Sequence, residues 1–326
     1  VLISPKSLTV SGSSVTNKTY DGTTAIASSA GTLSGFIGTE TVTATSSATA
    51  SSKDAGSRNA TLVYTLSDGS NGGLAGNYSL ANTSLSVLIS PKALSVSGST
   101  VTDRIYDGTT AIASSVGTLS GFIGTETVTA TSVATASSKD VGSRNATLVY
   151  TLSDGSNGGL AGNYSLSNTT LPVLISPKAL TVSGSTVTDR IYDGTTAIAS
   201  TAGTLSGFIG TETVTASSVA TASSKDVGNR TATLVYTLAN GSNGGLASNY
   251  SLANSNLSVS IAIKDLTVVG TKIETKVFDG KTDAKASGGI LVGVVGGDQI
   301  TLIENATFVS SNVGLSVPVI MNSQIF

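Results

Sequence analysis

Short runs in which apolar and polar residues alternate recur along the whole chain. One run sets Leu94 and Val96 between serines, and another places apolar residues at Leu148, Tyr150 and Leu152. Alternation with a period of two predicts β-strands that turn one side to a core. No stretch of a dozen residues shows the helical period, and Thr, Val and Ile dominate these runs. The sequence therefore predicts an all-β protein.

Turn signals separate the runs. Asp107-Gly108 and Ser120-Gly121 are dipeptides that favour tight turns, and residues 154–159 read Asp-Gly-Ser-Asn-Gly-Gly. Because these signals lie close together, the strands between them must be short.

The pattern repeats with a period of 86 residues. Pro5, Pro91 and Pro177 follow one another at that interval, and Lys264 continues the series begun by the lysine after each proline. A repeat of this size with about seven short strands predicts a small antiparallel β-sandwich of the immunoglobulin-like kind or a β-grasp-like sheet. The two topologies stay open at this point.

The repeat sets the expected domain boundaries. We expect β repeats at 5–90, 91–176 and 177–262, and an incomplete, divergent β repeat at 263–326. Residues 1–4 have the sequence of residues 87–90 and are expected to be the last-strand remnant of a preceding repeat. The joints are short, and Pro177 stiffens the connection between the second and third repeats, so the repeats should form a semi-rigid rod.

Composition removes several classes of protein. The chain has 17 Lys and Arg against 19 Asp and Glu, a net charge of −2, and neither His nor Cys. It therefore cannot hold a Ser-His-Asp or Cys-His catalytic system, the usual zinc site or a haem. Acidic residues could pair as in a glycosidase, but near-identical tandem copies are a poor way to build one cleft. We expect no enzyme activity, no catalytic residues, no cofactor and no metal.

Charge and hydropathy also limit the partners. A pI of about 5.1 leaves no basic stripe for nucleic acid. No run approaches the roughly 20 apolar residues that a bilayer span needs. The partners that remain are neighbouring repeats, other copies of the chain in a fibre, and host or matrix glycans or proteins bound through regions outside this sequence.

An ordered series of short motifs resembles a known repeat. In the third repeat these are Ile-Ser-Pro-Lys-Ala-Leu-Thr-Val-Ser-Gly at 175–184, Arg-Ile-Tyr-Asp-Gly-Thr-Thr-Ala at 190–197 and Lys-Asp-Val-Gly at 225–228. The series is similar to the YDG repeat of large bacterial surface proteins of the filamentous haemagglutinin type. The resemblance covers all four repeats and implies all-β modules in an exported fibre, generally as a stalk between an anchored end and an adhesive end. It carries no catalytic residues.

The Tyr106-Asp107-Gly108 motif could be a ligand site repeated along the chain. The simpler interpretation is structural: Gly108 supplies a positive φ angle, Asp107 caps the turn and Tyr106 anchors a strand in the core. Phe278 stands at the equivalent position of the fourth repeat. We prefer the structural interpretation, because there the ring is kept and the hydroxyl is lost.

The loop that begins at Asp154 resembles a calcium loop at first sight. It lacks the several carboxylates that calcium needs, and the third repeat has Asn240 at that position. We interpret it as a glycine-rich hairpin loop. One acid stands beside a glycine turn in every repeat (Glu40, Glu126, Glu212 and Asp298). A single carboxylate makes a poor ion site.

Three further features of the sequence suggest chemistry. Lys92, Asn163 and Glu126 recur in step, so an internal Lys-to-Asn amide crosslink is a hypothesis. Several Asn-x-Ser/Thr triplets, such as those at Asn145 and Asn163, leave glycosylation open. Alternating threonines could present a flat face to ice or sugar, but such a row is more simply the solvent face of a strand. These are Thr125, Thr127, Thr129 and Thr131.

We expect the chain to be a structural stalk or spacer of an exported bacterial adhesin or extracellular fibre, located at the cell surface or outside the cell. The alternative is a self-assembling filament or sheath subunit that pairs strands between chains. A glycan-binding module ranks third.

Overall fold

Two compact units make up the chain. The computed structural model describes all residues from 1 to 326, and the units are Val1–Ser176 and Pro177–Phe326. The first unit contains repeats 1 and 2, and the second contains repeats 3 and 4. Strands hold 53% of the residues, and the only helical segments are 3-10 turns of three residues. The all-β prediction is confirmed.

Each of the first three repeats has ten strands and one 3-10 turn in the same order. In repeat 1 the elements are β1 (Lys6–Ser11), β2 (Ser14–Val15), β3 (Lys18–Thr19), β4 (Ala25–Ile26), β5 (Ser28–Ser29), β6 (Thr32–Ser34), β7 (Val42–Ala50), β8 (Gly56–Asp68), η1 (Ala75–Asn77), β9 (Tyr78–Leu80) and β10 (Thr83–Ser90). In repeat 2 they are β11 (Lys92–Ser97), β12 (Thr100–Val101), β13 (Arg104–Ile105), β14 (Ala111–Ile112), β15 (Ser114–Ser115), β16 (Thr118–Ser120), β17 (Val128–Ala136), β18 (Gly142–Asp154), η2 (Ala161–Asn163), β19 (Tyr164–Leu166) and β20 (Thr169–Ser176). In repeat 3 they are β21 (Lys178–Ser183), β22 (Thr186–Val187), β23 (Arg190–Ile191), β24 (Ala197–Ile198), β25 (Ser200–Thr201), β26 (Thr204–Ser206), β27 (Val214–Ala222), β28 (Gly228–Asn240), η3 (Ala247–Asn249), β29 (Tyr250–Leu252) and β30 (Ser255–Ala262).

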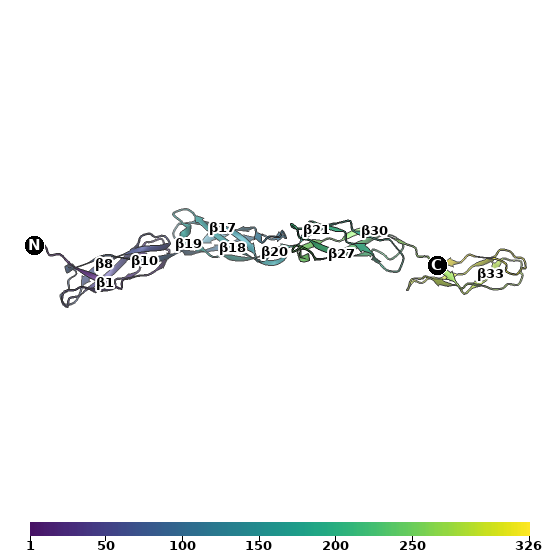
Figure 1. The fold of residues 1–326 in the computed structure, drawn as a ribbon, viewed down its shortest axis with the longest axis horizontal. Helices are drawn as coiled ribbons and strands as arrows, with labels where there is room; N and C mark the ends of the chain where they lie inside the picture. Colours follow the sequence, from purple (N-terminus) through teal and green to yellow (C-terminus); the bar gives the residue numbers. More distant parts are fainter. The chain divides into compact units, whose positions relative to one another are not determined.

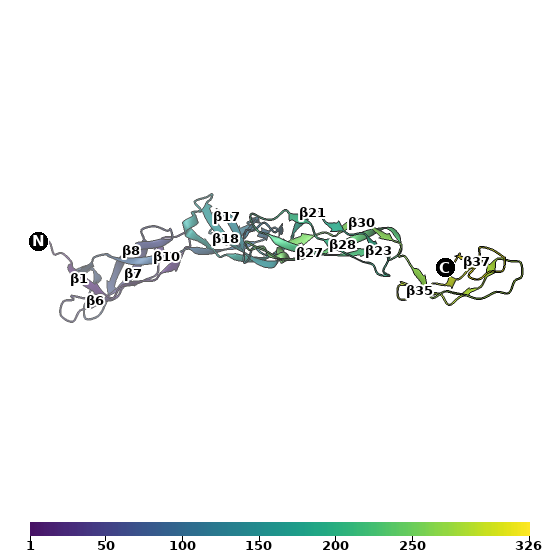
Figure 2. The same cartoon turned by 45° about the vertical axis from the view of Figure 1, so that its right-hand side comes forward.

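Two larger sheets and one two-stranded sheet form each of these repeats. In repeat 1 the larger sheet has the order β3-β10-β8-β7-β4, the smaller has the order β6-β1-β9, and β2 pairs with β5. Figure 2 shows β23, β30, β28 and β27 of the larger sheet of repeat 3. The sheets are mixed, because β1 pairs parallel with β9 and β3 pairs parallel with β10. Each module is thus a layered arrangement of sheets with two parallel pairs among antiparallel ones.

The long central hairpin explains why the apolar residues alternate. On β8, Ala60 and Leu62 are fully buried, while Val63 is 46% exposed. Across the pair, Ala48 of β7 faces Leu62 and Ala50 faces Ala60. The core of repeat 1 gathers along one face of the larger sheet: Tyr20, Ile26, Ala48, Ala50, Ala60, Leu62, Val87 and Ile89. Burial of this face, which removes apolar area from water, is the main source of stability in a unit without disulfides.

The joint within the first unit is a single residue long. Strand β10 ends at Ser90, Pro91 follows, and β11 starts at Lys92. The two repeats of this unit lie end to end (Figure 1). Proline cannot donate a hydrogen bond to a ladder, so it separates the last sheet of one repeat from the first sheet of the next.

Repeat 4 is built from fewer strands. They are β31 (Thr267–Val269), β32 (Lys272–Ile273), β33 (Asp283–Ala284), β34 (Ala286–Ser287), β35 (Ile290–Val292), β36 (Leu302–Ile303), β37 (Ala306–Phe308), β38 (Val319–Met321) and β39 (Gln324–Ile325). Its largest sheet has the order β33-β37-β38 and has no strand in the position of β10, β20 or β30. No helix in the structure has the length and apolar character that crossing a membrane requires.

Truncation of the core strand β18 should destabilise the chain. Leu148 is fully buried there, whereas its neighbour Val149 is 50% exposed. We expect Leu148→Ala to lower the free energy of unfolding by about 2–5 kcal/mol, because a cavity is left behind. The matched control Val149→Ala should change it by less than about 0.5 kcal/mol. Urea denaturation followed by circular dichroism measures both, and equal losses would contradict the assignment of the two faces.

Candidate functional site: the joint between repeats

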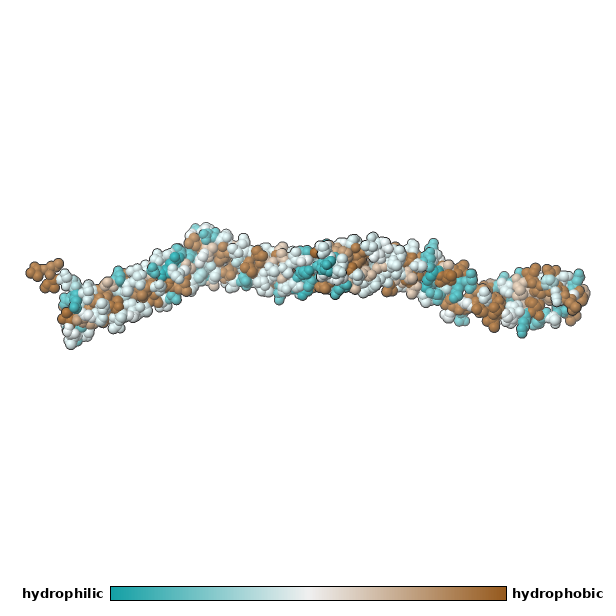
Figure 3. Space-filling view, in the orientation of Figure 1, coloured by the Kyte–Doolittle hydropathy of each residue, from teal (hydrophilic) through white to brown (hydrophobic).

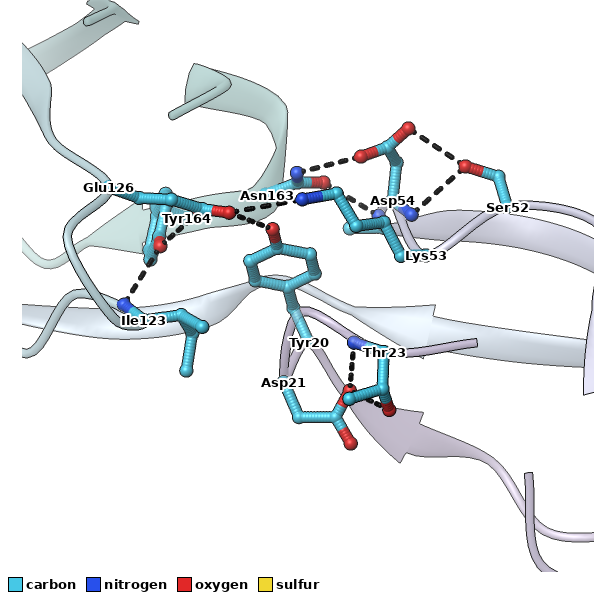
Figure 4. Close-up of polar contacts among 11 residues, drawn as sticks. Tyr20, Asp21, Thr23, Ser52, Lys53, Asp54, Ile123, Glu126, Asn163 and Tyr164 are labelled. Atoms are coloured by element: carbon cyan, nitrogen blue, oxygen red, sulfur yellow. Dashed lines mark hydrogen bonds and ion pairs between the residues drawn. The ribbon is translucent and has the colours of Figure 1, made fainter. Parts of the chain in front are cut away.

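The tyrosine of the Tyr-Asp-Gly motif reaches from one repeat to the next. Tyr20 follows β3, and its backbone N–H donates to the Ser90 carbonyl at 2.8 Å, which continues the parallel pairing with β10. Its side chain is 1% exposed. Its hydroxyl donates to Oε1 of Glu126 in repeat 2 at 2.8 Å (Figure 4). The motif therefore lies at the end of repeat 1 that meets repeat 2.

Glu126 is the acceptor at which the two repeats meet. A turn holds it just before β17, with its N–H donating to the Ile123 carbonyl at 3.0 Å. Its Oε2 accepts the hydroxyl of Tyr164 at 2.7 Å, and its Oε1 also accepts Nζ of Lys53 at 3.2 Å. The rings of Tyr20 and Tyr164 stack edge to face with centroids 5.6 Å apart. One buried carboxylate thus binds two donors from repeat 1 and one from repeat 2.

A second polar contact lies beside the first. Asn163 ends η2 of repeat 2 and is 2% exposed. Its Oδ1 accepts the backbone N–H of Ala55 at 2.7 Å, and its Nδ2 donates to Oδ1 of Asp54 at 3.0 Å. Ser52 donates to the other oxygen of Asp54 at 2.8 Å. Both the oxygen and the nitrogen of the amide are bonded to repeat 1, so this contact fixes the orientation of repeat 2 on repeat 1 as well as its distance.

The remaining two residues of the motif form the turn that carries the tyrosine. Oδ1 of Asp21 accepts the N–H of Thr23 at 2.9 Å and Nζ of Lys18 at 2.7 Å. Burial raises the pKa of Asp21, but the bonds from Lys18 and Thr23 outweigh this effect and lower the pKa to about 2. Gly22 has a φ of 79°, and a Cβ there would lie 2.9 Å from the side chain of Ile123. The glycine is required by the turn and by the approach of repeat 2.

The same geometry in repeat 2 tests the interpretation made from sequence. Thr109 donates its N–H to Asp107 at 2.9 Å, and Gly108 has a φ of 79°. Tyr106 is 1% exposed, as expected for an anchor. The turn roles and the burial are therefore as predicted. One part of the interpretation is wrong. The replacement by Phe278 suggested that the tyrosine hydroxyl has no role, but the hydroxyl of Tyr20 donates a hydrogen bond to Glu126 in the joint.

Burial and hydrogen bonding act against each other on the joint carboxylate. Burial raises the pKa of Glu126, but bonds from Tyr164, Tyr20 and Lys53 outweigh burial and hold the pKa below its ordinary value. The pKa of Tyr20 is raised, first by burial and then by the adjacent Glu126 carboxylate. The charged glutamate and the neutral tyrosine are therefore the stable pair near neutral pH.

The second unit contains a reduced form of this joint. The hydroxyl of Tyr192 donates to Oδ1 of Asp298 in repeat 4 at 3.0 Å, while Nζ of Lys225 stands 3.9 Å from the same oxygen. The side chain of Asp298 is 22% exposed, against 9% for Glu126. Since aspartate is one methylene shorter, the lysine is held less closely than Lys53.

The crosslink hypothesis is not supported by the placement of its residues. Glu126 pairs with Lys53 of repeat 1, and the amide of Asn163 is bound to Asp54 and Ala55. Lys92 instead stands opposite Tyr164 in the parallel pair of β11 and β19. The hydrogen bonds of Glu126 and of the Asn163 amide are therefore made to residues other than Lys92.

The other candidate residues have structural environments. Oδ1 of Asp154 accepts the N–H of Ala161 at 2.7 Å, so it closes the loop. A Cβ on Gly159 would lie 1.9 Å from the Thr127 carbonyl, so the loop requires a glycine there. The hairpin prediction is wrong, because the loop joins β18 of the larger sheet to η2 and β19 of the smaller sheet, and β18 and β19 do not pair. Thr129 and Thr131 are exposed on β17, Asn145 is exposed on β18, and Asn163 is buried.

Sequence reasoning missed Lys53 and Tyr164 as parts of a joint. Lys and Asp recur at this position in the first three repeats, and the fourth has Ser311 and Asn312. Phe278 replaces the motif tyrosine in the same repeat. The fourth repeat lacks the tyrosine, the lysine and the aspartate at the same time. This simultaneous loss is the signal in the sequence that could have shown that the three residues act together.

Removal of the Tyr20 hydroxyl should weaken the contact between repeats 1 and 2 and lower the stability of the chain. We expect Tyr20→Phe to lower the free energy of unfolding by about 1.5–3 kcal/mol, because it removes a buried hydrogen bond to a charged group. In a double-mutant cycle with Glu126→Gln, the losses should be non-additive. The control is Tyr64→Phe, since Tyr64 bonds Ser13 at 2.8 Å within repeat 1. Strict additivity for Tyr20 and Glu126 would refute the coupling.

The joint should also weaken in acid. Because the folded pKa of Glu126 is lowered, its stabilisation is complete above the unfolded value of roughly 4.3 and is lost as the pH falls through the folded value. We expect the difference in stability between the unmodified chain and Glu126→Gln to stay level while the pH is above roughly 4.3 and to shrink as the pH falls further, measured by urea titration at each pH. A constant difference would show that the carboxylate charge does not act in the joint.

Comparison with known families agrees with the repeat. The model of the YDG domain matches residues 4–85, 90–171, 176–257 and 262–325. No curated protein shows significant similarity to the chain. The four matches together cover most of the sequence and include every Tyr-Asp-Gly or Phe-Asp-Gly turn described above. The chain therefore belongs to the YDG domain family.

Proposed function

We propose that the chain is a spacer segment of an exported bacterial surface protein or extracellular fibre, which holds a functional end away from the cell. The observation that carries the proposal is the joint: Tyr20, Lys53 and Asp54 of one repeat bind Glu126 and Asn163 of the next. Fixed end-to-end contact between modules is what a spacer needs in order to transmit a constant separation.

The construction of the joint supports a mechanical role. A flexible linker would leave the repeats free to reorient, whereas here Pro91 is the only residue between the strands β10 and β11. Glu126 and Asn163 are buried and hydrogen-bonded to repeat 1, so bending the joint would expose Glu126 or leave it without its partners. Loss of such partners typically costs a few kcal/mol.

The proposed location is extracellular. The YDG resemblance to large bacterial surface proteins supports it, and so does a composition without the thiols that an oxidising environment would alter. The proposal assigns no chemistry to the chain, since the recurrent polar residues of the motif are engaged in the turn and the joint.

Small-angle X-ray scattering of the chain should give an asymmetric pair-distance distribution with a long tail, typical of an elongated particle. A double variant, Glu126→Gln with Asn163→Ala, should broaden this distribution because it weakens both contacts of one joint. A compact particle for the unmodified chain would refute the spacer proposal. Identical curves for the chain and the variant would show that these contacts do not set the angle between repeats 1 and 2.

A further inference from the structure

One edge of the larger sheet of repeat 2 is open along the first half of strand β17. The sheet has the order β13-β20-β18-β17-β14, and β14 pairs only with Ala134 and Thr135 of β17. Strand β17 begins at Val128, so its first half has a strand partner on one side only, in β18. An unpaired strand edge therefore lies within a complete repeat.

The backbone of β17 directs hydrogen-bonding groups out of this edge. The N–H of Ala136 donates to the Thr110 carbonyl at 2.8 Å, on the side of β14. Because the N–H and C=O groups of successive strand residues point alternately to opposite sides, those of Val128 and Ala130 point to the same side as those of Ala136. The ladder with β14 does not reach Val128 or Ala130, so these groups have no strand partner there. A row of such groups is what a second polypeptide backbone recognises.

A groove of about 400 Å³ lies beside the open edge. One wall is the start of β17, with Val128 and Ala130, and the other is β16, an edge strand of the smaller sheet, with the residues that flank it. Val116, Leu119 and Phe122 supply apolar side chains to this second wall, and no charged residue lines the groove. The groove therefore combines an unpaired backbone with apolar side chains.

The open part of β17 lacks the features that usually protect an edge strand. Residues 128–133 are Val-Thr-Ala-Thr-Ser-Val, with no proline and no charged residue. The pairing with β18 is regular from Val128 to Ala136, so no bulge twists the edge away. In Figure 3 residues of intermediate hydropathy cover much of the visible surface of repeats 1 and 2. Since charges, prolines and bulges are what prevent the addition of a further strand, this edge is open to one.

We propose that this groove binds an extended, uncharged segment of a partner polypeptide, which adds to the larger sheet beside β17. Its backbone pairs with Val128 and Ala130, and its apolar side chains, at alternate positions, pack on Val116, Leu119 and Phe122. The unpaired backbone favours a polypeptide, and the uncharged lining favours a segment without charges, because burial of an unpaired charge is costly. The proposal is independent of the spacer function, which depends on the joints.

The first three repeats share the residues of this groove with one exception. Leu119, Phe122 and the start of β17 have identical equivalents in repeats 1 and 3, whereas Val116 is replaced by Ala30 and Ala202. Because valine offers more apolar area than alanine, we expect repeat 2 to bind the segment most tightly.

A synthetic peptide tests the proposal on the whole chain. The probe is Thr-Leu-Val-Tyr-Thr-Leu-Ser, the sequence of residues 147–153, with blocked ends and a fluorophore, and its anisotropy is followed as the chain is added. We expect saturable binding and new protection of residues 128–132 in hydrogen exchange. Two further peptides carry N-methyl groups on alternate residues, one on each set. Because only one set of N–H groups can face β17, one of these peptides should lose binding and the other should keep it.

Two valines provide matched variants of the chain. Val116→Ala should weaken peptide binding at repeat 2 roughly fivefold, because it removes apolar area from the groove. It introduces the residue that repeats 1 and 3 have, so the variant should fold. Val133→Ala removes the same groups from a side chain that is 71% exposed and does not line the groove, so binding should stay unchanged.

Each outcome supports or overturns the proposal. Absence of saturable binding, equal binding of the two N-methylated peptides, or no new protection at residues 128–132 would refute it. Protection of these residues that rises with the concentration of the chain alone would identify the partner as a second copy, which supports it. A neutral oligosaccharide such as maltoheptaose that protects these residues, while the peptide does not, would assign the groove to a glycan and overturn it.

Discussion

A buried carboxylate cannot be left without partners, and this constraint organises the joint between repeats 1 and 2. Glu126 is 7% exposed and its partners are Tyr20, Lys53 and Tyr164. Two of these three belong to the preceding repeat. Separation of the repeats would therefore break two of the three hydrogen bonds of Glu126 and give up the stabilisation that these bonds to a charged group provide. The folding of one repeat and its contact with the next are energetically linked for this reason.

The motif that names the family combines three parts of this arrangement. The tyrosine supplies the donor, the aspartate ties the turn together, and the glycine allows both a positive φ and the close approach of Ile123. In the second unit Asp298 takes the place of the glutamate. This shorter acid still accepts the hydrogen bond of the Tyr192 hydroxyl, but its distance to Lys225 is longer than that between Glu126 and Lys53. The joint can therefore be tuned by small changes at one acid.

The sequence alone was sufficient for the features that depend on local pattern. Alternation predicted the strands, the period predicted the repeats, and Asp107 and Gly108 were correctly placed in a turn. The partners of Tyr20 could not be predicted, since Glu126 lies 106 residues away and nothing local marks the pairing. The parallel strand pairs were missed because short alternating runs do not encode direction. Lys92 was grouped with Glu126 from matching periodicity, although equal spacing says nothing about distance in space.

The division of the joint between two ends of a repeat has a genetic consequence. The first three repeats each carry the tyrosine, lysine and aspartate of one half and the glutamate and asparagine of the other. Recombination that inserts or removes a whole number of repeats joins matching halves, so every product keeps complete contacts. An exchange that shifts the frame by part of a repeat would break a core and a joint together. Copy number can therefore vary among descendants while the period stays fixed.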